Sequence, residues 1–169
     1  MVSLSLSMIY KKHSDKTSFG FTIVELLIVI VVIGILAAIT IVSFNGVTSK
    51  ANVSKSQSDL KNMQKLIEMY KVDNGTYPNT SQNWYFSDAA GASGGDGFIP
   101  GVVPTYAKSL PRPTAGAYIY ISNGTDYKIM RYNAIPSGEW AAVPTTLIDG
   151  TGATNKDRFG YWTPGGLVM

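Results

Sequence analysis

One apolar stretch limits what this chain can fold into. From Phe21 to Val42 every side chain is apolar or small, apart from Thr22, Glu25 and Thr40. As a helix with a rise of about 1.5 Å per residue, this stretch is about 33 Å long, which is enough to cross a bilayer core of about 30 Å. It therefore predicts a membrane-spanning helix near the N-terminus.

Glu25 is the one charged side chain in this stretch. An ionised carboxylate in hydrocarbon costs about 2.5–3.5 kcal/mol, so it needs a partner. Three explanations remain open: the side chain reaches water at the cytoplasmic edge, the N–H-rich start of a helix stabilises it, or the chain is cut after Gly20. The cut would free an amine on Phe21 as a counter-ion. In a bundle of identical helices, that pairing would also fix the register.

The segment GFTIVELLIVIVVIGILAAI, residues 20–39, resembles the N-terminus of a type IV prepilin or pseudopilin. The resemblance implies that a membrane-embedded aspartic prepilin peptidase cuts between Gly20 and Phe21 and that the new amine of Phe21 is methylated. It also implies that the subunits assemble into a helical filament through these helices. Glu25, with Thr22 beside it, then sets assembly and register.

The spacing of small residues, two departures from the family pattern and the leader complete the description of this region. Gly34 and Ala38 are four residues apart, a spacing of small side chains that lets helices approach closely. The sequence departs from the family pattern at Val42, where many pilins have proline, and at Phe19, where a basic residue is common. Residues 1–20 read as a cytoplasmic leader that starts at Met1 or Met8.

Composition excludes several classes of function. The chain has no cysteine, and its one histidine, His13, lies in the predicted leader. Nucleophilic triads that need His and the usual zinc ligand sets are therefore excluded from the mature chain, and no nucleotide-binding motif is present. Residues 1–20 hold three of the lysines and one of the aspartates, which leaves a net charge of +1. Nucleic acid binding is not favoured by this balance, and the chain is predicted not to be an enzyme.

Residues 43–74 predict a continuation of the helix with one apolar face. Apolar residues recur at steps of three and four, as on the core-facing side of an amphipathic helix. The predicted face is Val47, Ala51, Leu60, Met63, Ile67 and Tyr70. Asn74-Gly75 predicts the end of the helix, because Gly tolerates the left-handed backbone that follows a helix. The segment Gly75-Thr-Tyr-Pro78 resembles the G-x-Y-P turn at which the family's spine helix often ends.

Residues 75–169 predict a loop-rich head with a small sheet. Tyr106 to Pro111 resembles the Y-x-x-x-L-P segment that precedes the sheet in many pseudopilins. The strongest hairpin signal pairs residues 117–122 with 125–132 across Asn123-Gly124. One face of this hairpin is expected to pack on the helix. Its tyrosines are candidates for an exposed surface, with about half of them in the core.

A calcium site is a weak further candidate. Asp149, Asn155 and Asp157 carry oxygen ligands in one polar loop. Their spacing lacks the order of an EF-hand loop, so a plain polar turn is the favoured interpretation and no cofactor is required.

The sequence thus predicts an α+β fold, in which a long spine helix packs on a small antiparallel sheet. Its parts are a leader at 1–20, a membrane and assembly half at 21–42, an amphipathic half at 43–74 and a head at 75–169. The predicted function is a type IV pilus-like filament subunit for adhesion, motility or DNA uptake. The alternatives are a type II secretion pseudopilin and a non-polymerising, membrane-anchored binding protein.

This interpretation also predicts partners and location. The partners are further copies of the chain, the prepilin peptidase, an assembly platform and a separate motor ATPase. A contact with DNA, as in a competence pilin, is a lesser alternative that salt-dependent retention of duplex DNA would test. The chain would begin as a single-pass protein of the cytoplasmic membrane with its C-terminus outside, and end in a periplasmic or extracellular filament.

Overall fold

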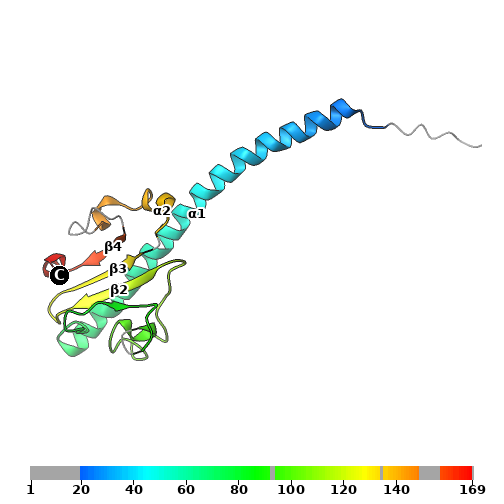
Figure 1. Cartoon of the computed structure of the whole chain (residues 1–169). Helices are drawn as coiled ribbons and strands as arrows, with labels where there is room; N and C mark the ends of the chain where they lie inside the picture. Colours follow the sequence, from blue (N-terminus) through cyan, green and yellow to red (C-terminus); the bar gives the residue numbers. More distant parts are fainter. Residues whose placement is uncertain (1–19, 92–93, 134, 149–156, 169) are drawn as a thin grey trace, which may run out of the picture. The chain divides into compact units, whose positions relative to one another are not determined.

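The computed structural model describes residues 20–91, 94–133, 135–148 and 157–168. The chain divides into two compact units, Met1–Thr40 and Ile41–Met169, which are described separately. The helices and strands, in chain order, are α1 (Ile23–Asn74), β1 (Tyr85–Phe86), η1 (Gly95–Phe98), β2 (Ala117–Ser122), β3 (Tyr127–Tyr132), α2 (Ser137–Trp140), η2 (Thr145–Leu147), β4 (Arg158–Trp162) and η3 (Pro164–Val168) (Figure 1).

The ends of α1 follow from local chemistry. The helix begins directly after Thr22, whose hydroxyl can cap the first free N–H groups. It ends at Asn74, and Gly75 follows with φ +75° while its N–H donates to the carbonyl of Lys71 at 2.8 Å. This is the left-handed stop that the Asn-Gly pair predicted.

The buried face of α1 differs from the predicted one at its first two positions. Val53, Leu60, Met63 and Ile67 are buried in the core, and Tyr70 packs against it. Val47 is 67% exposed and Ala51 is also exposed, so the prediction is wrong there. At about 100° per residue, both lie on the opposite side of the helix from Val53 and Leu60. The polar Ser56 takes a buried place on the true face.

The strands form one antiparallel sheet in the order β1-β2-β3-β4. Paired residues share a face, so the register defines two sides. The inner face carries Tyr118, Tyr120, Tyr127, Ile129 and Phe159, which pack in one core with the buried residues of α1. The outer face carries Ala117, Ile119 and Met130, packed with Trp84, Phe86 and Tyr132. The pilin-like α+β fold predicted from the sequence is confirmed.

The predicted hairpin is present, but its turn is longer than an Asn-Gly pair. Ser122 pairs with Tyr127, so β3 begins two residues later than expected. The side-chain oxygen of Asn123 accepts hydrogen bonds of 2.8 Å from the N–H groups of both Thr125 and Asp126. These bonds stabilise a four-residue loop at 123–126. They occupy the N–H groups of Thr125 and Asp126, which are then not available for strand pairing.

The tyrosines of the sheet do not form an exposed surface. Tyr118, Tyr120 and Tyr127 are fully buried, while Tyr85, Tyr132 and Tyr161 are half-buried. Residues 118, 120 and 127 face α1, whose apolar side chains cover them. An outward contact of the head therefore cannot use Tyr118, Tyr120 or Tyr127. The outer edge of β4 is partly covered, because Phe159 forms a bridge with Ile148.

Candidate functional site

The first turn of α1 ties Glu25 to Thr22. The Glu25 carboxylate oxygen Oε2 accepts hydrogen bonds from the backbone N–H of Thr22 at 2.8 Å and from its hydroxyl at 2.7 Å. In return, the Thr22 hydroxyl accepts from the N–H of Glu25 at 3.2 Å. This reciprocal arrangement is a capping box, and its T-x-x-E pattern was readable in the sequence. Thr22 therefore holds the carboxylate beside the start of the helix.

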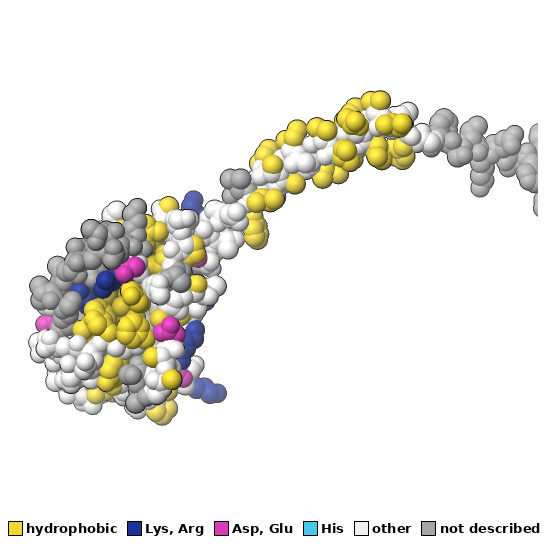
Figure 2. Space-filling model, in the orientation of Figure 1, with side chains coloured by type: hydrophobic (Ala, Val, Ile, Leu, Met, Phe, Trp, Pro, Cys, Tyr) yellow, Lys and Arg dark blue, Asp and Glu magenta, His cyan; other side chains and the backbone are white. Residues whose placement is uncertain are grey.

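The side chains that follow this turn are apolar and exposed. Across residues 21–41 the exposed fractions of the large hydrophobic side chains run from 48% at Val32 to 87% at Phe21. Thr40 is polar, but its hydroxyl finds an acceptor within the helix, because it donates to the Leu36 carbonyl. Among the described residues, α1 is the one helix long and apolar enough to cross a membrane. Figure 2 shows these side chains in yellow along the helix.

Gly34 and Ala38 lie on this exposed helix. A Cβ placed on Gly34 would meet no atom within 4 Å outside the helix itself, so nothing in the chain occupies the space beside it. The predicted role of these two residues in helix packing stays a prediction.

The two family-like segments of the head both contact the last turns of α1. The Tyr77 hydroxyl donates to the Glu68 carboxylate at 3.2 Å, and the Tyr127 hydroxyl donates to the same group at 3.3 Å. The Tyr106 hydroxyl donates to Asp73 at 2.8 Å, and this bond raises the pKa of Tyr106. The G-x-Y-P and Y-x-x-x-L-P segments therefore fix the loops of the head to the end of the helix.

A buried ion pair that the sequence reading missed joins three elements. Arg131 on β3 donates from Nη1 to the Glu139 carboxylate of α2 at 2.6 Å. The same nitrogen lies 3.2 Å from the Ser56 hydroxyl, and the Asn52 amide of α1 donates to Glu139 at 2.8 Å. The alternation of β3 was the available signal, because 127, 129 and 131 must share one face.

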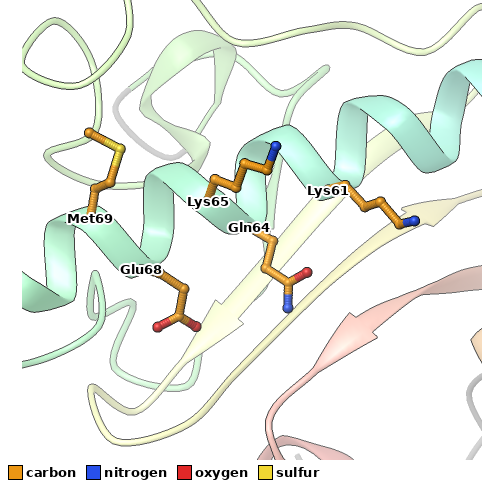
Figure 3. A pocket seen from close by; sticks show the side chains of 5 residues that line it. All are labelled: Lys61, Gln64, Lys65, Glu68 and Met69. Atoms are coloured by element: carbon orange, nitrogen blue, oxygen red, sulfur yellow. The ribbon is translucent and has the colours of Figure 1, made fainter.

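One hollow of about 500 Å³ lies along α1 and is lined by Lys61, Gln64, Lys65, Glu68 and Met69 (Figure 3). All five come from the same helix, and Glu68 already accepts hydrogen bonds from two tyrosines. The hollow is an open flank of α1 and holds no matched pair of catalytic groups among the residues that line it.

The calcium candidates are largely outside the described residues. Asp149 and Asn155 fall there, and the carboxylate of Asp157 accepts a hydrogen bond from Arg158 Nε at 3.1 Å. Within the described ranges, no group of three or more His, Cys, Asp or Glu side chains is arranged to hold a metal. The calcium site stays an untested prediction.

Comparison with known proteins places these features in a family. The family model "Type II secretion system (T2SS), protein G" matches residues 44–133, which is more than half of the chain. The chain belongs to the protein G family of the type II secretion system. A second model, "Prokaryotic N-terminal methylation motif", matches residues 15–41 and so covers Gly20, Phe21 and Glu25. The protein G family and this motif confirm the pilin and pseudopilin resemblance.

Individual members of the protein G family match only part of the chain. The type II secretion system core protein G of Pectobacterium carotovorum is 40% identical over 63 residues, which are 37% of this chain and 40% of the relative. That of Escherichia coli is 41% identical over 63 residues, 37% of this chain and 43% of the relative. That of Vibrio cholerae is 38% identical over 72 residues, 43% and 48% respectively. The chain thus spans less than half the length of these relatives.

No solved structure gave a significant match. Membership of the protein G family agrees with a structural subunit rather than an enzyme. It also favours the secretion pseudopilin, given above as an alternative, over a surface pilus for adhesion, motility or DNA uptake.

Proposed function

We propose that this chain is a filament subunit of a type II secretion system. In this proposal, prepilin peptidase cuts between Gly20 and Phe21, the amine of Phe21 is methylated, and residues 21–42 pack with those of neighbouring copies. The predicted parts at 1–20, 21–42, 43–74 and 75–169 then act as leader, assembly helix, spine and head. The family membership and the methylation motif both support this proposal.

The observation that carries the proposal is the exposed apolar surface of residues 21–41. These side chains are exposed, whereas the same helix buries its apolar face from Val53 onward. Burying apolar surface contributes about 25 cal/mol per Å², so an uncovered helix of this kind needs lipid or other helices around it. Before assembly the bilayer would supply this cover, and afterwards neighbouring copies would.

Glu25 gives the assembly its register. Its two hydrogen bonds from Thr22 both use Oε2, which keeps the carboxylate at the end of the helix where cleavage would create the amine of Phe21. A buried carboxylate without a counter-ion is costly, so each Glu25 in the filament would require one amine nearby. Helices shifted along each other would leave both groups unpaired, and this penalty selects one register.

The proposal also includes a motor ATPase, an assembly platform and a location for the filament. The chain has no nucleotide-binding motif, so a motor ATPase and an assembly platform must supply the energy for extrusion. The subunit would be located in the cytoplasmic membrane before assembly. The filament would extend into the periplasm, where it would act on exported proteins.

The test is made in cells that hold a type II secretion system, with the full chain expressed in place of their own protein G. Intact mass should show a chain that begins at a methylated Phe21. Glu25→Ala should still be cut but should lose cross-linked filaments and secretion, at least tenfold, because the register partner is gone. Asp88→Asn, which removes one exposed acid outside the apolar stretch, should behave as the unchanged chain.

Two results would reject the proposal. An uncut chain would remove its first step. A chain that is cut but forms no cross-linked filaments would favour a simple membrane anchor. Normal filaments from Glu25→Ala would reject only the role of Glu25 in register.

A further inference from the structure

A small pocket opens on the outer face of the sheet, the side that α1 does not cover. It has a volume of about 110 Å³ and is lined by Trp84, Phe86, Ile119, Tyr132 and Arg158. The register explains the assembly of this pocket, because Phe86 lies opposite Ile119 and Tyr132 lies opposite Arg158. In Figure 2, apolar side chains gather on the near face of the head, over the strands.

The walls of the pocket are ordered by contacts among themselves. The rings of Phe86 and Tyr132 meet edge to face with centroids 6.0 Å apart. The guanidinium carbon of Arg158 lies 5.8 Å from the centre of the Tyr132 ring. Ile119 is buried and forms the floor, while the three aromatic rings and Arg158 stay half-buried. A ligand would therefore meet side chains that are already placed, which lowers the entropy lost on binding.

Size and charge restrict what fits. Small-molecule sites usually enclose about 300–1,000 Å³, so this pocket is suited to one side chain of a partner and not to a cofactor. Of the described residues that line it, Arg158 alone is charged. A guanidinium has five N–H donors, and among the described residues Arg158 pairs with the Asp157 carboxylate through Nε at 3.1 Å, which leaves its Nη groups for a second carboxylate. Aromatic walls and an Arg at the rim are also the residue types that anchor protein interfaces.

We propose that this pocket docks a polypeptide partner that presents one apolar side chain followed by a carboxylate. The apolar group would enter between the rings of Trp84, Phe86 and Tyr132, and the carboxylate would pair with Arg158. The inference goes beyond the filament role, because the pocket is complete within a single head and does not require assembly.

The test uses the full chain in detergent micelles, labelled with ¹⁵N on its tryptophans, so that the indole signal of Trp84 can be followed. The probe is the peptide acetyl-Ala-Leu-Asp-Ala-amide. We expect a saturable shift of the Trp84 signal with a dissociation constant of about 1 mM, as for one anchor taken from a larger interface. The Leu-Asn peptide, which has the same shape without the charge, should bind about tenfold more weakly.

Variants of the chain test whether Arg158 binds the carboxylate of the peptide. Arg158→Gln should weaken the Leu-Asp peptide about tenfold and leave the Leu-Asn peptide unchanged. Lys65→Gln, which removes one positive charge from α1, is the matched control and should have no effect. If Arg158→Gln does not fold, Arg158→Lys keeps the charge, loses the planar fork, and should give an intermediate loss.

Four outcomes would overturn the proposal. They are the absence of a saturable shift up to about 20 mM peptide, equal affinity for the Asp and Asn peptides, a tighter response to maltotriose than to the peptide, and a shift that depends on protein concentration alone. The third would indicate a glycan site, and the fourth a contact with a second copy of the chain.

Discussion

The two halves of α1 are continuous in the chain and opposite in their surroundings. In residues 21–41 the large apolar side chains are exposed on every side of the helix. From Val53 onward, one face is buried against the sheet, and the other face carries lysines and acids. The second half has its core within this chain. The first half has no such core among the described residues.

This difference assigns separate roles to the two halves of α1. Changes in the second half should act on the stability of the head, whereas changes in the first half should act on membrane insertion or assembly. The polar residues follow the same division. Within the part of the chain that the structure describes, Glu25 bonds inside its own turn, while Asn52 and Ser56 reach the buried ion pair of the head.

The largest expected effect is at the buried ion pair. Glu139→Ala should lower the free energy of unfolding of the head by about 3–5 kcal/mol, because it leaves the guanidinium of Arg131 buried without its carboxylate. Urea unfolding followed by tryptophan fluorescence measures this change. The double change Arg131→Met with Glu139→Leu should recover most of the loss, since no charge stays buried. A loss equal to that of the single variant would contradict the role given to the ion pair.

Leu60 tests the core of the second half directly. Leu60→Ala should destabilise the head by about 3 kcal/mol, because the side chain is fully buried and its removal leaves a cavity. The matched control is Leu27→Ala, the same change on the exposed half, which should leave the unfolding of the head unchanged. Equal losses from the two variants in urea unfolding would show that the halves are not separate in their energetics.

Sequence alone predicted the features that depend on neighbours along the chain. The start of α1, its stop at Asn74-Gly75 and the two strands around Asn123 all have local signals. Two errors were local. Val47 and Ala51 lie on the side of α1 away from Leu60 at about 100° per residue, so the helical spacing alone separates them from the buried face. The late start of β3 depends on the side chain of Asn123. The other errors came where distant segments decide the outcome.

The buried charges were missed for the same reason. Arg131 faces α1 only because of the register of β3, and Glu139 reaches it only because α2 lies close by. The same holds for the sheet tyrosines, whose burial depends on which face α1 covers. By contrast, the contact of Thr22 with Glu25 spans three residues and was readable from the sequence.

Alkaline pH should also act on the head alone. Burial raises the pKa of Tyr118, Tyr120 and Tyr127 above the value of about 10 in an unfolded chain. Above that pH the unfolded chain releases protons that the folded head keeps, so unfolding becomes more favourable. The stability from these groups is complete below about pH 10 and falls above it, by up to about 1.4 kcal/mol per pH unit for each tyrosine.

Urea midpoints on both sides of pH 10 measure this slope. Tyr120→Phe removes one of the three groups and should reduce the slope, while residues 22–42 contain no tyrosine and should keep their helicity in micelles. A slope that does not change with Tyr120→Phe would contradict the assignment to these tyrosines.

The smallest effect is expected at the first turn of α1. Thr22→Ala removes the hydroxyl that bonds with Glu25 and should destabilise this turn by about 1 kcal/mol. Amide hydrogen exchange at residues 23–26, measured in micelles, should become about fivefold faster, while exchange in the head should not change. Thr22→Ser keeps the hydroxyl and is the control. If Thr22→Ala also speeds exchange in β2 or β3, the start of the helix is coupled to the head, and the separation of the two halves fails. If only the first turn responds, the capping box acts locally, as its hydrogen bonds within one turn require.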